Sequence, residues 1–318
     1  MKKNIFCTLG PTSLNKNFLN FSNKHVDLLR LNLSHIEIKN LQKTIDFVKK
    51  NSKVPICIDT EGAQIRSKVK KKKTYRIGDL IKISSSNKSM FSLYPSKVFK
   101  ILKKGDVLDV GFEGLKIKIL NKKKKICSAK VIKFGNLENN KGIYLVNRKI
   151  KLDYLTEKDF KAIEIGKKNK IRYYALSFVN SHIDVINFNK ILKNEIKIFK
   201  LETNSAMKNL KKIMKAGDNF LIDRGDLSKE IEIENIPIAQ RKILKFTKKN
   251  KKIYIATNFL ESMIEKNFPT RAEVNDIYNA LELGAKGIVL AAETAIGKYP
   301  IECVLLLKKI FKKFKKVK

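Results

Sequence analysis

The stretch Ile196-Lys197-Ile198-Phe199-Lys200-Leu201-Glu202 is a short apolar run that ends on charged side chains. Short apolar runs with polar ends are typical of buried strands. The segment Ser205–Lys215 follows it and has the apolar spacing of a helix. A strand that leads into a helix is the repeating unit of parallel sheets. The stretch therefore predicts one βα unit, and the same alternation recurs along the chain.

Seven further short apolar runs have this character, and each is a predicted strand. They are Asn4–Thr8, Val26–Asn32, Val54–Thr60, Ile171–Phe178, Asn219–Asp226, Lys252–Asn258 and Gly287–Thr294. Helix-like segments such as Ile36–Lys50 and Ile236–Lys249 lie between them. Eight strands alternating with helices predict an α/β fold, the TIM (β/α)8 barrel. A length of 318 residues suits such a barrel with one insertion.

One long segment, from about residue 67 to residue 150, breaks this alternation. It contains the turn pairs Gly78-Asp79 and Gly105-Asp106, and short alternating runs such as Leu115–Ile119. These features are typical of strands joined by tight turns. We therefore expect a discontinuous barrel domain, residues 1–66 and 151–318, with a small inserted β-barrel lid domain at residues 67–150.

The chain is strongly basic, with 69 Lys and Arg against 30 Asp and Glu and a formal net charge of +39. Such a charge is compatible with binding to a nucleic acid through its phosphates. Lys is much more frequent than Arg, however, and Arg is the residue expected for bidentate phosphate and base contacts. We therefore expect no nucleic-acid partner. The positive field would still attract a small polyanionic substrate.

The remaining composition narrows the class of protein further. The four cysteines are widely spaced and form no CxxC pair, and the three histidines have no metal-binding spacing, so neither a zinc site nor a disulfide framework is predicted. No apolar run reaches membrane-spanning length, and no secretory leader is recognisable. A cytoplasmic protein is expected. The basic tail Tyr299–Lys318 is interpreted as the last barrel helix rather than a membrane-surface helix.

Charged side chains gather where the predicted strands end, which is where barrel enzymes place their catalytic groups. Glu202 and Asp226 offer two carboxylates from adjacent strands, and such a pair suits Mg²⁺. Lys200 and Arg30 add two cations suited to phosphoryl charge. Each residue alone has a structural explanation, because Lys200 and Glu202 could form a salt bridge and Asp226 could cap a helix. The whole set favours phosphoryl transfer.

Nine motifs occur along the chain in one order. They are Cys7–Ser13 (CTLGPTS), Leu29–His35 (LRLNLSH), Asp59–Arg66 (DTEGAQIR), Leu155–Asp159 (LTEKD), Lys200–Glu202 (KLE), Arg224–Leu227 (RGDL), Ala256–Met263 (ATNFLESM), Pro269–Glu273 (PTRAE) and Glu293–Pro300 (ETAIGKYP). This set resembles the catalytic barrel and lid of pyruvate kinases, and it covers the whole chain outside the predicted lid. The resemblance implies transfer of a phosphoryl group from phosphoenolpyruvate to ADP, giving pyruvate and ATP in glycolysis.

The resemblance also implies roles for individual residues. The catalytic residues would be Lys200, Arg30 and Thr257, and substrate would be bound by these three with Gly225 and Asp226. Glu202 and Asp226 would ligate Mg²⁺ or Mn²⁺. The implied K⁺ site consists of Asn32, Ser34, Asp59 and Thr60. The implied nucleotide contacts are His35, Arg66 and Lys141, the last two at or within the lid.

Several positions depart from the family pattern. Glu61, Ala63 and Gln64 stand where the family has Lys, Pro and Glu, and the neutral Gln64 leaves K⁺ dependence open. The lid turn contains Glu113 in place of an Asp-Asp-Gly sequence, and Ala291-Ala292 precedes Glu293 where Ser-Gly is typical. The family's C-terminal effector domain is expected to be absent, which predicts no sigmoidal response to sugar phosphates.

Four functions remain under comparison. The first is an active pyruvate kinase, for which a homo-oligomer formed through barrel faces is considered. The second is a degenerate relative that binds phosphoenolpyruvate or a partner without turnover, suggested by the altered lid. The third is another metal-dependent barrel enzyme acting on a 2-oxo acid, against which Lys200 and Thr257 argue. The fourth is a nucleic-acid-binding protein, which the charge alone supports.

Overall fold

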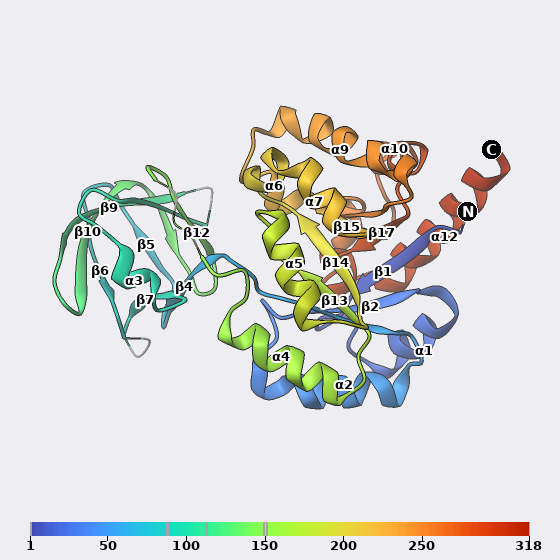
Figure 1. Cartoon of the computed structure of the whole chain (residues 1–318), viewed down its shortest axis with the longest axis horizontal. Coiled ribbons are helices and arrows are strands. Elements are labelled where there is room, and N and C mark those ends of the chain that lie inside the picture. Colours follow the sequence, from blue (N-terminus) through green and yellow to red (C-terminus); the bar gives the residue numbers. More distant parts are fainter. Residues whose placement is uncertain (1, 87–88, 112–113, 149, 151, 318) are drawn as a thin grey trace. The chain divides into compact units, whose positions relative to one another are not determined.

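The structure is a computed structural model that describes residues 2–86, 89–111, 114–148, 150 and 152–317 (Figure 1). The chain divides into two compact units. The larger contains residues 1–62 and 157–318, and the smaller contains residues 63–156. The expected division lay at residues 66 and 150. It differs because Ile65–Val69 forms a strand, β4, that pairs with two strands of the smaller unit.

The larger unit is a closed barrel of parallel strands in the order β1-β17-β16-β15-β14-β13-β3-β2. Its strands are β1 (Asn4–Thr8), β2 (Leu28–Asn32), β3 (Ile56–Asp59), β13 (Tyr173–Leu176), β14 (Ile196–Leu201), β15 (Asn219–Asp223), β16 (Lys252–Ala256) and β17 (Gly287–Leu290). Each predicted strand contains one of these eight. The TIM-barrel prediction is therefore confirmed.

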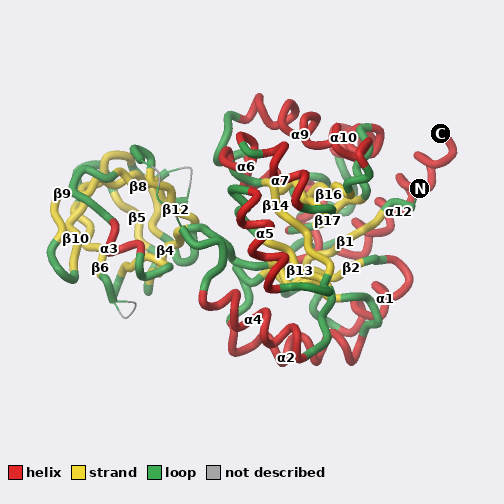
Figure 2. Tube along the Cα trace, viewed as in Figure 1, coloured by secondary structure: helices red, strands yellow, loops and turns green. Residues whose placement is uncertain are grey.

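Helices surround the strands of this unit, shown in red around the yellow strands in Figure 2. They are α1 (Lys16–His25), α2 (Ile38–Asn51), α4 (Glu157–Lys168), α5 (His182–Ile191), α6 (Asn204–Lys208), α7 (Leu210–Ala216), α8 (Arg224–Leu227), α9 (Ile236–Leu244), α10 (Arg271–Glu282), α11 (Ala292–Ala295) and α12 (Pro300–Val317). Three 3₁₀ turns join them, at Ile233–Asn235, Lys245–Lys249 and Glu261–Ile264. Among the described residues, no helix is both long and apolar enough to cross a membrane.

Several predicted elements end differently in the structure; the strands predicted to reach Asn258 and Thr294, for example, end at Ala256 and Leu290. The predicted strand Asn219–Asp226 stops at Asp223, because the chain turns there into the short helix α8. Asp226 therefore lies on a helical turn and not on a strand. The predicted helix Ser205–Lys215 divides at Asn209, the C-cap of α6. The predicted helix Ile236–Lys249 ends as an α-helix at Leu244 and continues as a 3₁₀ turn.

The interior of the barrel is filled by side chains from every strand. They are Phe6, Leu28, Cys57, Ala175, Ile198, Leu221, Tyr254, Ala256 and Val289. This is the packed core that a closed eight-stranded barrel requires. The alternate residues face outward and pack under the helices, as when Phe199 of β14 contacts Phe188 of α5 at a ring distance of 6.2 Å.

The smaller unit is a second closed barrel, in the order β10-β6-β7-β4-β12-β8-β9, with a separate two-stranded sheet of β11 and β5. Its elements are β4 (Ile65–Val69), β5 (Lys73–Tyr75), β6 (Leu80–Ser84), β7 (Phe91–Tyr94), α3 (Val98–Ile101), β8 (Val107–Val110), β9 (Leu115–Lys122), β10 (Ile126–Lys133), β11 (Gly135–Leu137) and β12 (Gly142–Leu145). Its core is formed by alternating apolar residues such as Leu115, Ile117 and Ile119. The predicted inserted β-barrel is confirmed.

Candidate active site

Alternation along the strands decides which polar side chains enter the barrel. In five neighbouring strands, the residue two positions beyond a core side chain points to the same face. This places five polar residues together at the carboxyl ends of the strands: Arg30, Asp59, Ser177, Lys200 and Asp223. All five are buried, with exposures between 0% and 8%. Buried polar groups need partners, and these residues supply them to one another.

Arg30 and Asp59 form the first part of this network. Asp59 Oδ2 accepts hydrogen bonds from Arg30 Nε at 2.6 Å and contacts Nη2 at 2.5 Å. Arg30 Nη1 donates to Thr8 Oγ1 at 2.9 Å. Burial alone would lower the pKa of Arg30, but Asp59 and Asp223 outweigh it, so the net effect raises the pKa. The guanidinium therefore stays charged at the barrel mouth.

Lys200 stands at the centre of the network. Its Nζ lies 3.0 Å from Glu202 Oε2, 3.2 Å from Asp223 Oδ2 and 3.6 Å from Asp59 Oδ2. It also donates to Ser177 Oγ at 3.2 Å. Burial would lower the pKa of Lys200, but the three carboxylates more than compensate and raise it. The salt bridge between Lys200 and Glu202 considered from sequence is thus present, within a larger cluster.

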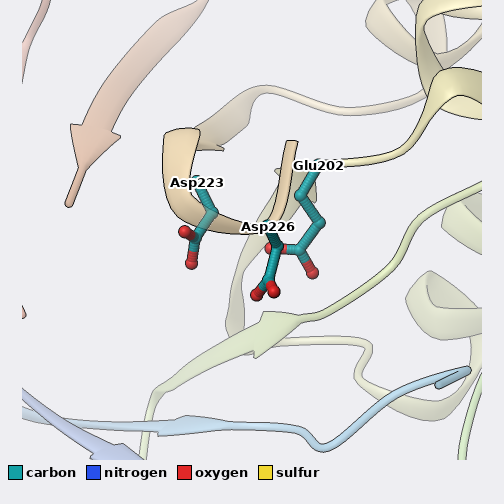
Figure 3. Close-up of side chains that lie close together, drawn as sticks. All are labelled: Glu202, Asp223 and Asp226. Carbon is teal, nitrogen blue, oxygen red and sulfur yellow. The ribbon is translucent and has the colours of Figure 1, made fainter. Parts of the chain in front are cut away.

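Three carboxylates, those of Glu202, Asp223 and Asp226, lie close together (Figure 3). Glu202 follows β14, Asp223 ends β15, and Asp226 lies on α8. One oxygen from each lies within 4.8 Å of the other two. Lys229 Nζ also contacts Asp226 Oδ1 at 2.9 Å, from a position near the surface. The sequence predicted two of these acids as metal ligands, and the structure brings a third to the same point.

The acidic cluster has the chemistry of a divalent-cation site. Glu202 is fully buried. Its Oε1 accepts a hydrogen bond from the Phe178 amide, and its Oε2 faces Lys200 Nζ at 3.0 Å without a well-aligned hydrogen bond. Burial raises the pKa of Glu202 to about 8; Lys200 opposes this rise, and Asp223, Asp226 and Asp59 add to it. The buried negative charge is therefore incompletely balanced. Carboxylate oxygens are the ligands that Mg²⁺ and Mn²⁺ prefer, so these residues fit the predicted ion.

Thr257 lies next to Gly225 on the other side of α8. Thr257 Oγ1 accepts a hydrogen bond from the Gly225 amide at 2.8 Å and donates to the Ala256 carbonyl at 2.6 Å. Thr257 has φ +70°, a left-handed conformation that is costly for a β-branched residue. Arg224 Nη2 donates to the Thr257 carbonyl at 2.6 Å. The Arg224 side chain and the Gly225 amide, both on α8, thus hold Thr257 in this strained position.

The four predicted K⁺ ligands lie on two adjoining segments. The Leu33 amide donates to the Asp59 carbonyl at 3.0 Å, which aligns Asn32–Ser34 with Asp59–Thr60. Asn32 Oδ1 accepts from the Ser34 amide at 3.0 Å, and Thr60 Oγ1 accepts from the Ser177 amide at 3.0 Å. Oxygen donors from these segments suit a hard monovalent cation, and the K⁺ assignment stays a prediction.

The three predicted nucleotide contacts fall in different units. His35 is exposed on the loop after β2 of the larger unit, where its amide donates to the Asn32 carbonyl at 3.0 Å. Arg66 lies on β4 of the smaller unit and Lys141 directly precedes β12, which pairs with β4. The Lys141 amide donates to Ser67 Oγ at 2.9 Å. Arg66 and Lys141 are therefore neighbours across the ladder.

Comparison with known proteins now identifies the family. The family model described as the pyruvate kinase barrel domain matches residues 1–304. The chain belongs to the pyruvate kinase family. It is 31% identical to the pyruvate kinase of Thermotoga maritima, with 98% of this chain and 71% of the relative covered. It is 34% identical to the pyruvate kinase of Methanocaldococcus jannaschii, covering 98% and 69%, and 31% identical to the chloroplastic pyruvate kinase isozyme G of Nicotiana tabacum, covering 96% and 58%.

Within this pyruvate kinase barrel, the departure at Glu61 has a clear local explanation. Glu61 is 4% exposed, and its Oε1 lies 2.8 Å from Lys158 Nζ. Lys158 also donates to the Leu33 carbonyl. Asp159 accepts from the amides of Glu61 at 2.7 Å and Gly62 at 3.1 Å. The first residues of α4 therefore hold the loops that carry the K⁺ candidates.

The positions of the other departures from the family pattern say less about their effect. Gln64 is buried and directly precedes β4. Glu113, the candidate lid carboxylate, lies outside the described residues. Glu293 is 2% exposed and accepts from the amides of Leu260 at 3.2 Å and Ala291 at 2.7 Å, so it ties the ends of β16 and β17.

Sequence reasoning missed two residues of the cluster, Ser177 and Asp223. Ser177 Oγ donates to Asp59 Oδ1 at 3.1 Å and accepts from Lys200 Nζ, so it links β3, β13 and β14. Asp223 contacts the same ammonium. A signal for both was available, because each lies two residues beyond a core side chain, Ala175 and Leu221 respectively.

Proposed function

We propose that the chain catalyses transfer of the phosphoryl group of phosphoenolpyruvate to ADP, giving pyruvate and ATP. The observation that carries the proposal is the position of two buried cations, Arg30 and Lys200, beside one carboxylate, Asp59. Both lie at the carboxyl ends of barrel strands, where barrel enzymes carry out their chemistry. Family membership supports the same reaction.

Positioning and charge stabilisation supply most of the catalysis in phosphoryl transfer. Arg30 would hold the substrate phosphate, with its guanidinium oriented by Asp59 and Thr8. Lys200 would balance the charge on the phosphoryl group in transit. Because Ser177 and three carboxylates orient the lysine, little reorganisation is needed when the substrate binds.

The acidic cluster would hold the divalent ion, with Glu202 and Asp226 as ligands. A bound Mg²⁺ or Mn²⁺ supplies positive charge next to substrate oxygens. Gly225 and Asp226 are expected to bind substrate, but their backbone amides are paired internally, with Thr257 Oγ1 and with Asp223 respectively. Their role in substrate binding therefore stays a prediction, as does the K⁺ site.

Thr257 is the candidate for the protonation step. Loss of the phosphoryl group leaves an enolate, which takes a proton at its terminal carbon to become pyruvate. Thr257 Oγ1 is held beside the Gly225 amide and donates to the Ala256 carbonyl, so its hydroxyl has a defined direction. We propose that this hydroxyl positions the proton delivered to the enolate.

A coupled assay tests the proposal. Pyruvate formation from phosphoenolpyruvate and ADP, in the presence of Mg²⁺ and K⁺, is followed by the oxidation of NADH with lactate dehydrogenase. Lys200→Met should lower kcat by on the order of 10³-fold or more, since it removes the cation next to the transferred group. The matched control is Lys251→Met, at the opposite end of the barrel, which pairs with Asp218.

Two results would contradict the proposal. One is a folded, metal-replete protein that forms no pyruvate, and the other is unchanged turnover in Lys200→Met. Calorimetry then separates the alternatives. Binding of phosphoenolpyruvate without pyruvate formation would indicate a degenerate relative that has lost turnover. Absence of binding would indicate a different substrate.

A further inference from the structure

We propose that Asp223 is a third carboxylate ligand of the divalent cation, and that it allows the chain to bind the ion before any phosphate-bearing substrate. The inference deepens the proposed function, because it concerns the same metal site. The two ligands expected from sequence are Glu202 and Asp226. Asp223 was not among them.

Backbone geometry places Asp223 in the cluster. It ends β15, beside Glu202 at the end of β14, and it lies three residues before Asp226 across the junction with α8. The helical turn brings residues three apart to one side. As a result, one oxygen from each of the three acids lies within 4.8 Å of the others. Figure 3 shows the three side chains close together.

The positions of charged atoms show that these carboxylates converge on a cation. Lys200 Nζ bridges Glu202 Oε2 at 3.0 Å and Asp223 Oδ2 at 3.2 Å. Glu202 has no exposed surface, and its Oε2 has no well-aligned hydrogen bond beside its ion pair with Lys200. A buried carboxylate oxygen normally has a hydrogen-bond donor or a metal as partner. The oxygen that lacks a well-aligned hydrogen bond is the one that faces Lys200 in the cluster.

The balance of charge points to a divalent ion. Four carboxylates, Glu202, Asp223, Asp226 and Asp59, surround two buried cations, Arg30 and Lys200. With all four carboxylates ionised, the net charge of this group is −2, which one divalent cation neutralises. Without Asp223 it would be −1. Lys229 contacts Asp226 from the rim, where its side chain is 36% exposed and solvent screens its charge.

The number of carboxylates has a consequence for binding order. Mg²⁺ usually takes one or two protein carboxylates and completes its shell with water and substrate phosphates. A third carboxylate adds negative charge and a further oxygen that do not depend on the substrate. The free protein should therefore bind the ion by itself, and Asp223 should account for much of that affinity.

The experiment measures Mn²⁺ binding to the whole chain with neither phosphoenolpyruvate nor nucleotide present. Unbound Mn²⁺ is followed by electron paramagnetic resonance. Asp223→Asn keeps the size of the side chain and an oxygen for the Asp226 amide but removes the charge, and it should weaken binding by at least about 10-fold. The matched control is Asp218→Asn, one residue before the other end of the same strand, where the carboxylate is 84% exposed and should leave Mn²⁺ affinity unchanged.

A second pair of variants covers the case in which Asp223→Asn does not fold, because Lys200 loses a partner. Lys200→Met/Asp223→Asn removes both members of the ion pair, and it is compared with Lys200→Met alone. The double variant should again bind Mn²⁺ at least about 10-fold more weakly than the single one.

The results separate this inference from the proposed function. Unchanged Mn²⁺ affinity in Asp223→Asn, or equal affinities in the two lysine variants, would overturn it, even if the enzyme forms pyruvate. Weakened binding would support it, even if no pyruvate forms. If Glu202→Gln weakens binding and Asp223→Asn does not, Asp223 serves only as the partner of Lys200 and the inference is wrong.

Discussion

Asp59 Oδ2 accepts a hydrogen bond from Arg30 Nε at 2.6 Å and lies 2.5 Å from Arg30 Nη2. No part of the Asp59 side chain is exposed. The same oxygen lies 3.6 Å from Lys200 Nζ. One buried carboxylate therefore orients both cations: Arg30, which is proposed to hold the substrate phosphate, and Lys200, which is proposed to balance the charge of the phosphoryl group in transit. Asp59 therefore contributes both to the stability of the fold and to the geometry of the site.

The first prediction concerns this carboxylate. Asp59→Asn leaves Arg30 and Lys200 buried with less negative charge nearby, so the free energy of unfolding should fall by about 3–5 kcal/mol. Urea denaturation at neutral pH measures the change. Asp218→Asn, an exposed acid paired with Lys251, should change it by no more than about 0.5 kcal/mol. A loss below about 1 kcal/mol for Asp59→Asn would show that the cluster does not depend on Asp59.

The second prediction concerns the departure from the family at Glu61. Glu61→Lys introduces the family residue opposite Lys158, only 2.8 Å from the present carboxylate oxygen, in a site that is 4% exposed. Two like charges there should reduce the free energy of unfolding by about 3–5 kcal/mol. Thermal unfolding of Glu61→Lys, Lys158→Glu and the double exchange measures the coupling. The double exchange should be more stable than the sum of the single changes predicts by at least about 1 kcal/mol. Additive effects would contradict the ion pair.

The barrel was predictable from sequence because strand and helix periods differ and recur in order. Asn4–Thr8 was predicted with both of its ends. Asn219–Asp226 was predicted too long, since an apolar run with a polar end does not reveal where the chain turns into a helix. Lys200 and Glu202 were predicted as site residues because they stand at the end of a recognisable strand.

Contacts between distant elements were not predictable in this way. Asp159 accepts hydrogen bonds from the amides of Glu61 and Gly62, which lie 98 and 97 residues earlier in the chain. No local sequence pattern predicts a contact across that separation. Gly62 itself shows the constraint, because a Cβ there would lie 2.6 Å from the Ser177 carbonyl oxygen, and its φ is +68°. Such close approaches appear only when β3 and β13 are placed side by side.

The third prediction concerns pH and Glu273, in the capping box of α10. Glu273 accepts hydrogen bonds from Ser262 Oγ at 2.6 Å and from the amides of Ser262 and Thr270 at 2.7 Å. Burial alone would raise the pKa of Glu273, but these donors lower it below its usual 4.5. The stability that Glu273 contributes is therefore fully present above about pH 4.5 and is lost as the pH falls through the folded value.

Glu273→Gln tests this sign. At neutral pH the variant should be less stable than the parent by about 1 kcal/mol, because the carboxylate caps the helix and holds the turn at Ser262. The gap should close as the pH falls below 4.5 and through the lowered pKa of Glu273. Glu282→Gln, exposed at the last residue of the same helix, serves as the control and should show no such closing. A gap that stays constant with pH would contradict the assignment.

The last prediction separates stability from catalysis at Thr257. Thr257→Gly should relieve a strain of about 1–3 kcal/mol, since glycine adopts φ +70° at little cost, while losing a hydrogen bond to the Gly225 amide of about 1 kcal/mol. The free energy of unfolding should therefore fall by no more than about 1 kcal/mol, or rise. If the hydroxyl serves the protonation step, kcat should still drop by about 10²-fold or more. Thr257→Ser keeps the hydroxyl and should retain most of the activity. Denaturation and the coupled assay on the same samples measure both quantities. A variant that loses stability and activity in parallel would indicate that Thr257 only maintains the fold of the loop, whereas a stable variant without turnover places its hydroxyl in the reaction.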